Sequence, residues 1–186
     1  MSSRADAGPT ETVVLAGGCF WCTEAVFSEL KGVRSAVPGY AGGTVEHPSY
    51  EQVCTGRTGH AESVEVTFEP AVVPLHDLLV VFFTTHDPTT RDRQGPDVGS
   101  QYRSAVFYRT PEQKTAAEAV VREIAEEKLY GRPVVTEIVP LKTFFPAEEY
   151  HRAYFARHPE QAYCRAVIAP KLAKFRKAHA ARLAGR

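Results

Sequence analysis

Residues 62–68 have the most regular hydrophobic alternation in the chain, and this alternation constrains the fold more than any other feature. Three apolar side chains point to one face of a strand and three polar ones point to the other, namely Val64, Val66 and Phe68 against Ser63, Glu65 and Thr67. A strand with one apolar face needs another layer of structure packed on that face. The segment therefore predicts a sheet that is covered on at least one side.

The patterns around this strand alternate between strand and helix. Further strands are expected over Thr12–Ala16, Val33–Tyr40, Ser104–Tyr108 and Val134–Val139. Helical patterns are expected over 22–30, 49–54, 74–83 and 111–131. The order β-α-β-β-α-β, followed by α-β and a C-terminal helical region, matches the split β-α-β pattern. We predict an α+β fold, a two-layer α/β sandwich with a mixed sheet, built as a ferredoxin-like β-α-β-β-α-β core plus extra helices.

The composition is that of one ordinary globular domain. Of the 186 residues, 44% are hydrophobic and 24% are charged, which excludes intrinsic disorder, collagen and coiled coil as the main state. We expect a disordered N-terminal segment over 1–11 and a single domain over 12–186 that ends in a basic helical region. Lys plus Arg and Asp plus Glu number 22 each, so the net charge is zero. A nucleic-acid partner is therefore not expected.

The sequence also predicts a cytoplasmic protein. The first ten residues are polar and contain no apolar signal region. The longest strongly apolar run, Leu78–Phe83, is too short to span a bilayer. In this setting the four cysteines are expected to be free thiols, metal ligands or redox groups rather than a disulfide framework.

The candidate chemical site is the run from Gly17 to Cys22, where a strand turns into a helix. Cys19 lies at the start of the helix, where unpaired N–H groups and the helix dipole favour negative charge. We therefore expect a lowered pKa for Cys19, which would make its thiolate available as a nucleophile. Phe20 and Trp21 are either core side chains or the walls of an apolar pocket.

Three classes of protein fit these cysteines. The first is a nucleophilic or redox enzyme that uses Cys19. The second is a thioredoxin-like oxidoreductase with a Cys-X-X-Cys motif, although Phe-Trp is bulky for the turn of that motif. The third is a zinc module formed by Cys19, Cys22, Cys54 and His60, although the last two lack a compact metal-site spacing. Cys22 lies on the apolar stripe of its helix, so we expect a small buried hydrophobe there.

A candidate acid lies on the alternating strand. Glu62 is in phase with the apolar residues, so its side chain is expected to point toward the core. Burial raises the pKa of a carboxyl group, which then stays protonated near pH 7 and can act as a general acid. The alternative is a glutamate at a strand end that reaches solvent. The long loop Thr84–Arg103 adds Asp97 and Tyr102, which suit ligand binding, whereas Tyr50 is uninformative on its own.

Five motifs, in one order, resemble those of the peptide methionine sulfoxide reductases of the A type. They are Gly18-Cys19-Phe20-Trp21, Gly39-Tyr40-Ala41-Gly42-Gly43, Tyr50-Glu51-Gln52-Val53, Thr58-Gly59-His60-Ala61-Glu62 and Asp97-Val98-Gly99-Ser100-Gln101-Tyr102-Arg103-Ser104. The similarity runs from about Thr12 to His158. It implies an α/β sandwich with a ferredoxin-like core, in agreement with the element order, and makes residues 12–186 a single catalytic domain.

The resemblance implies a reaction at sulfur. Cys19 resembles the thiolate that attacks the sulfoxide sulfur and becomes a sulfenic acid as methionine is released. Glu62 resembles the acid that protonates the sulfoxide oxygen, and Tyr50 and Tyr102 resemble its hydrogen-bonding companions. No metal and no organic cofactor is expected.

The resemblance also implies how the substrate binds. Phe20 and Trp21 resemble the apolar pocket for the S-methyl group, and Asp97 is similar to a position that helps bind the polar part of the substrate. The implied substrates are methionine sulfoxides of the S epimer, both free and in oxidised proteins. Two features depart from the family pattern. Cys22 replaces a frequent glycine, and a basic, helix-like stretch over Pro170–Arg182 replaces the Gly-rich tail with cysteines that many relatives have.

Recycling of the sulfenic acid needs a second thiol, and thioredoxin is the implied reductant. We predict Cys164 as the resolving cysteine, because it follows a break at Pro159 in the region where relatives keep theirs. Cys54 is the next candidate. Cys22 is disfavoured, because a disulfide between two positions of one packed helical stripe is strained. The enzyme is expected to be a monomer without a membrane partner.

Overall fold

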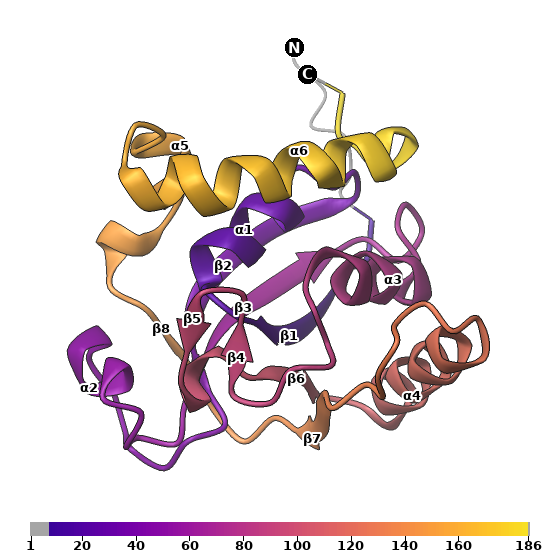
Figure 1. Cartoon of the computed structure of the whole chain (residues 1–186). Helices are drawn as coiled ribbons and strands as arrows, with labels where there is room; N and C mark the ends of the chain where they lie inside the picture. The colour runs from indigo at the N-terminus through magenta and orange to yellow at the C-terminus, as the bar shows by residue number, and fades with distance from the viewer. Residues whose placement is uncertain (1–7, 186) are drawn as a thin grey trace.

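The computed structural model describes residues 8–185 of the chain. A six-stranded sheet in the order β7-β6-β1-β3-β2-β8 forms its centre (Figure 1). The strands are β1 (Glu11–Gly17), β2 (Val33–Ala41), β3 (Ala61–Phe68), β6 (Ser104–Tyr108), β7 (Glu137–Pro140) and β8 (Phe144–Pro146). The helices are α1 (Phe20–Ser28), α2 (Tyr50–Cys54), α3 (Leu75–Thr85), α4 (Pro111–Glu126), α5 (Tyr154–Arg157) and α6 (Ala169–Ala178).

The ferredoxin-like core is confirmed. Its four strands lie in the order β6-β1-β3-β2, and every neighbouring pair is antiparallel. β7 adds a parallel strand next to β6, and β8 adds an antiparallel strand next to β2, so the sheet is mixed as predicted. β8 pairs only with the last three residues of β2, so residues 33–38 form an edge of the sheet, and Pro38 is the last residue of that edge.

The sheet carries its main core on one face. Val13, Leu15, Val64 and Val66 point to this face and pack with apolar residues of α1 and α3. A smaller cluster on the other face includes Val14, which packs with residues of β6 and β7. β1 is therefore buried on both faces, which fixes the position of the helix that follows it.

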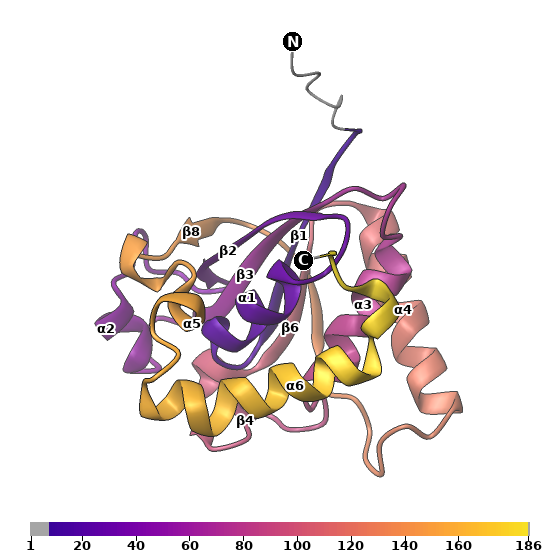
Figure 2. The ribbon, with the colours of Figure 1, turned by 90° about the horizontal axis from the view of Figure 1, so that it is seen from above.

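Helices surround this core in two groups. α6 lies along α1, and α3 lies beside α4 (Figure 2). A π-helix at Cys164–Ile168 leads directly into α6, and a 3-10 helix at Ala180–Arg182 follows it. The end of the chain is tied to the end of α1 by the hydrogen bonds Lys31 N to Arg182 O and Ala184 N to Glu29 O, both 2.8 Å. The basic C-terminal region is thus part of the fold.

The structure differs from the predicted elements at several ends. The loop 84–103 contains a short separate hairpin, β4 (Arg93–Gln94) and β5 (Asp97–Val98), and β8 was not predicted. α4 ends at Glu126 rather than near residue 131, and Lys128 beyond it has a left-handed φ of 51°. Most of the predicted disordered segment 1–11 lies outside the described residues, and Glu11 begins β1. Within 8–185, no helix is both long and apolar enough to cross a membrane.

Candidate active site

The junction between β1 and α1 places Cys19 at the first turn of the helix. β1 ends at Gly17, Gly18 has a φ of 93°, and Cys19 is the N-cap residue with the non-helical angles φ −53° and ψ 123°. A side chain at Gly18 would collide with the loop above it, because its Cβ would lie 2.5 Å from Cγ of Gln94. Gly18 is therefore needed both for the sharp turn and for the close approach of Gln94.

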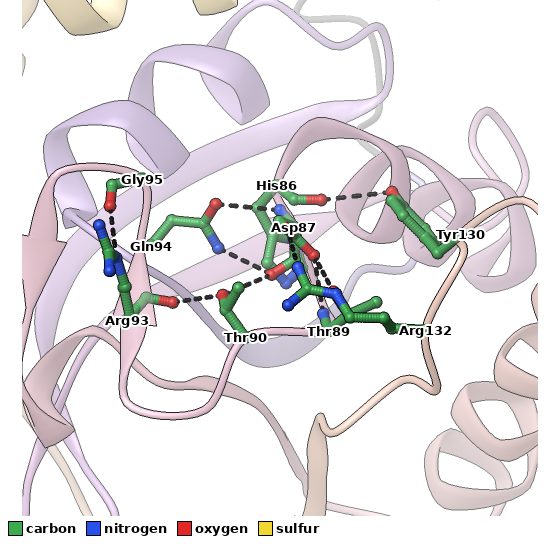
Figure 3. A network of polar contacts seen from close by, with 9 residues as sticks. All are labelled: His86, Asp87, Thr89, Thr90, Arg93, Gln94, Gly95, Tyr130 and Arg132. Carbon is green, nitrogen blue, oxygen red and sulfur yellow. Dashed lines mark hydrogen bonds and ion pairs between the residues drawn. The ribbon is translucent and has the colours of Figure 1, made fainter.

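Gln94 also holds the loop that carries Asp97 and Tyr102. Its Oε1 accepts from the N–H of Asp87 at 3.0 Å, and its Nε2 donates to the carbonyl of Asp87 at 2.9 Å (Figure 3). The carboxylate of Asp87 accepts from the N–H and the hydroxyl of Thr89 at 2.9 and 2.6 Å. The network fastens the start of the loop against the glycine turn, and so it positions the hairpin that bears Asp97.

Gly18→Ala should therefore cost stability as well as activity. The new Cβ meets Gln94, and the left-handed backbone conformation itself costs about 1–3 kcal/mol for a non-glycine residue. In thermal unfolding the midpoint should fall by several degrees, since a protein of this size loses roughly 2–4 °C per kcal/mol. Gly131→Ala is the matched control, because no atom lies within 4 Å of its added Cβ. Equal unfolding midpoints for the two variants would contradict this account of the turn.

Glu62 points into the core, as its strand position predicted. Its side chain is 2% exposed, and its Oε2 accepts from the N–H of Phe20 at 3.0 Å. Burial raises the pKa of Glu62 to about 8, and the negative charges of Asp97 and Cys22 act in the same direction. The hydrogen bond from Phe20 opposes the shift without cancelling it. The carboxyl group is therefore mainly protonated at pH 7. It lies against the backbone of Phe20, the residue that follows Cys19.

The expected low pKa of Cys19 is wrong for this arrangement. Cys19 is 8% exposed, and burial together with a hydrogen bond to Cys22 raises its pKa well above the ordinary value. The same hydrogen bond lowers the pKa of Cys22 to about 7, and the Lys171 ammonium contributes to this. Desolvation and the partner thiol thus outweigh the start of the helix for Cys19, and the two thiols titrate as a coupled pair.

The two predicted tyrosines lie near Glu62. Burial is the largest cause that raises the pKa of the Tyr50 and Tyr102 hydroxyls, and the Glu62 charge is the second. Both phenols therefore remain protonated donors. The N–H of Tyr50 donates to Glu148 at 2.8 Å, and a Ser49–Gln52 capping box begins α2, as the sequence predicted.

Phe20 and Trp21 have different surroundings. Phe20 is fully buried and stacks with Tyr50 at 6.3 Å between ring centroids, so it is a core side chain that also backs the site. Trp21 is partly exposed, and its ring stacks on Tyr154 at 3.8 Å with an interplanar angle of 6°. Its Nε1–H donates to Nδ1 of His151 at 3.0 Å. Trp21 thus offers an apolar surface that is fixed on two sides.

Three site residues were missed at the sequence level. His151 and Tyr154 hold Trp21, while the Tyr163 hydroxyl donates to Oδ2 of Asp97 at 2.6 Å and also helps to lower the pKa of Cys22. The available signal was general: a buried tryptophan N–H needs an acceptor. Nothing local identifies an acceptor 130 residues away along the chain.

The remaining cysteines lie on two sides of the site. Cys164 is fully buried in one cluster with Cys19 and Cys22, at the start of the π-helix. Cys54 is exposed, and its thiol is hydrogen-bonded to Tyr50. The zinc alternative fails at His60, because its Nδ1 accepts from the Gly43 N–H at 3.0 Å and its Nε2 lies 2.7 Å from a backbone carbonyl.

Comparisons with known proteins identify the family of the chain. A family model described as peptide methionine sulfoxide reductase matches residues 11–183. The peptide methionine sulfoxide reductase MsrA of Thermus thermophilus is 64% identical over 170 residues, which cover 91% of this chain and 96% of that protein. Mxr1 of Saccharomyces cerevisiae in reduced form superposes with a TM-score of 0.76 at 33% identity, over 88% of this chain and 95% of that one. Mxr1 in complex with Trx2 gives a TM-score of 0.55 at 25% identity, over 82% and 92%.

The matched family model and the similar proteins define the class as an oxidoreductase, and the chain has a cysteine at the first turn of a helix with a buried acid beside it. The chain belongs to the peptide methionine sulfoxide reductase family.

Proposed function

We propose that the protein reduces methionine S-sulfoxide, free and in proteins, with Cys19 as nucleophile and Glu62 as acid. The observation that carries the proposal is the buried Glu62 carboxyl, whose pKa is raised to about 8 beside the Cys19 turn. A sulfoxide oxygen leaves only after protonation, and a neutral carboxylic acid supplies that proton at pH 7.

The first step moves one oxygen from substrate to enzyme. The Cys19 sulfur bonds to the sulfoxide sulfur while Glu62 gives its proton to the oxygen. The sulfur–oxygen bond of the substrate then breaks, and the hydroxyl group passes to the Cys19 sulfur. The bond between the two sulfurs breaks as well, and its electron pair remains on the sulfur of methionine. Methionine leaves with its sulfur reduced, and Cys19 is oxidised to a sulfenic acid.

Cys22 is the base that we propose for this step. The Cys19 thiol is hydrogen-bonded to Cys22, whose pKa is about 7. A Cys22 thiolate can therefore accept the Cys19 proton as Cys19 attacks, so Cys19 needs no low pKa of its own. Phe20 and Trp21 would form the apolar wall for the S-methyl group, and Tyr50, Tyr102 and Asp97 would bind the polar part of the substrate.

We propose a different partner for Cys19 in the first disulfide from the one that the sequence favoured. The sequence favoured Cys164 and disfavoured Cys22 because of helix strain. However, Cys19 is the N-cap residue with non-helical angles, and the Cys19 and Cys22 thiols lie in one buried cluster, where each shifts the pKa of the other. We therefore propose that Cys22 attacks the sulfenic acid, which forms a Cys19–Cys22 disulfide and releases water. Cys164, in the same cluster, is the second candidate.

Two serine variants separate these candidates. After one equivalent of sulfoxide without reductant, peptide mapping should show a Cys19–Cys22 disulfide. Cys22→Ser should release one methionine per enzyme and then fail to turn over with thioredoxin, whereas Cys164→Ser should continue to cycle. The reverse pattern would return the resolving role to Cys164. Cys54→Ser, a change at an exposed thiol, should cycle normally.

Thioredoxin is the reductant in this proposal. The similarity to Mxr1, which forms a complex with Trx2, supports it. Attack on the Cys19 sulfur would release Cys22, and a thiolate with a pKa of about 7 is a good leaving group. This chemistry suits the cytoplasm, where thiols are kept reduced. All proposed residues belong to one chain, so a monomer with a single catalytic domain over residues 12–186 suffices.

Turnover of separated epimers tests the function. The S epimer of methionine sulfoxide, free and in a peptide, should be reduced with dithiothreitol and then with thioredoxin. The R epimer should be left unchanged in both assays. Equal rates for the two epimers, or no turnover of either, would overturn the proposal.

A further inference from the structure

Glu24 is a buried acid that the proposed chemistry does not use. It lies on α1, three residues after Trp21, and is only 6% exposed. A glutamate is rarely buried unless it has a specific partner. The partner in this case is a backbone segment almost 130 residues further along the chain.

The carboxylate of Glu24 caps the start of α5. Its Oε1 accepts from the N–H of Ala153 at 2.8 Å, and the neighbouring N–H of Tyr154 also favours the ionised carboxylate by lowering its pKa. α5 has no capping side chain of its own, and Ala153 has a left-handed φ of 49°. The conformation at the start of α5 is thus held from another helix.

This cap determines the position of one wall of the site. Tyr154 is the first residue of α5, and its ring lies flat on Trp21 at 3.8 Å. α1 therefore carries both the tryptophan and the group that holds the partner of that tryptophan. If the cap is lost, the backbone at the start of α5 loses a charged acceptor. The stack of Tyr154 on Trp21 then loses the contact that holds Tyr154 in place.

We propose that Glu24 is a positioning residue that locks Tyr154 against Trp21, and that protonation of Glu24 loosens this wall of the substrate pocket. The inference rests on the proposed function insofar as Trp21 contacts substrate. The clamp itself concerns only the free protein.

The ionisation of Glu24 falls in the physiological range. Burial raises its pKa to about 7, while the two backbone hydrogen bonds and the Arg157 and Arg152 charges oppose the shift. The pocket beside Glu24 is also lined by the apolar Leu172 of α6 and by Glu29, which forms an ion pair with Arg176. The ionised form is the better acceptor, so the clamp is complete above pH 7 and weakens below it.

The fluorescence of Trp21 measures this clamp directly, because the chain contains one tryptophan. A titration in a Cys22→Ser background removes the thiol that ionises in the same range. We expect an emission change with a midpoint near the Glu24 pKa of about 7. Glu24→Gln, which keeps the shape and loses the charge, should abolish the change and resemble the low-pH form at every pH. Arg152→Gln should move the midpoint to higher pH, because one opposing charge is removed.

Kinetics then connects the clamp to the pocket. With dithiothreitol as reductant and Cys22 intact, Glu24→Gln should raise KM for a methionine sulfoxide peptide by about three- to tenfold, with little change in kcat. The inference would be overturned if the pH-dependent emission change persisted in folded Glu24→Gln. It would also be overturned if the Cys22→Ser protein with Glu24 intact showed no such change. If Glu24→Gln loses the emission change but keeps the KM of the reference protein, the clamp stands and the role of Trp21 in substrate binding is overturned.

Discussion

Cys19→Ser should abolish methionine sulfoxide reduction with every reductant. A hydroxyl at this position is not ionised near neutral pH, and Cys22 with a pKa of about 7 is too weak a base to deprotonate it. The variant should fold as the parent does, since one oxygen replaces one sulfur at an N-cap position where serine is favoured. The measurement is methionine released per enzyme in a single turnover with the S epimer.

Cys54→Ser is the matched control for this loss. Cys54 is exposed and lies outside the buried cysteine cluster, and a serine hydroxyl can replace its thiol beside Tyr50, so the change should leave the single turnover intact. Release of methionine by folded Cys19→Ser would move the nucleophile to another thiol. In that case the Cys-X-X-Cys alternative, with Cys22 as nucleophile, would be the next to test.

Glu62→Gln should produce the second large loss. The amide keeps the size of the side chain, but it has no acidic proton to give to the sulfoxide oxygen. The chemical step should slow by about 10²- to 10⁴-fold, the range for a positioned general acid. Glu65→Gln is the matched control, because Glu65 lies on the same strand, outside the core, in an ion pair with Arg109. Equal single-turnover rates for both variants would contradict the assignment of the acid.

The pH dependence gives the same assignment a second test. The rate should rise as pH passes about 7, where the cysteine pair loses a proton, and fall as pH passes about 8, where Glu62 loses its own. Glu62→Gln should remove the falling limb. Cys22→Ser should shift the rising limb to higher pH, because the pKa of Cys19 itself is raised. A falling limb that survives in Glu62→Gln would show that another group supplies the proton.

Local patterns were sufficient where neighbours in sequence decide the structure. The alternation in β3 correctly placed Glu62 toward the core, and the Ser49–Gln52 spacing correctly predicted a capping box. The glycine turn before Cys19 was also correctly predicted. In each case the physical cause acts within a few residues, so the sequence shows it directly.

The electrostatics of the cysteines could not be predicted in this way. The sequence indicated a helix start beside Cys19 but not the depth of burial or the hydrogen bond to Cys22, and these reverse the direction of the pKa. Likewise, the partners of Trp21 lie on a segment far along the chain, and Glu24 gave no local sign of its role. Side chains that tertiary packing brings together stay hidden until the fold is known.

Transfer of isotopically labelled oxygen tests the central claim most directly. A Cys22→Ser, Cys54→Ser, Cys164→Ser variant retains Cys19 alone among the four cysteines. After one equivalent of methionine S-sulfoxide labelled at oxygen, mass spectrometry should find the label on the Cys19 peptide as a sulfenic acid, with one methionine released. Release of methionine with the label only in water, and with Cys19 still reduced, would contradict direct attack of Cys19 on the sulfoxide.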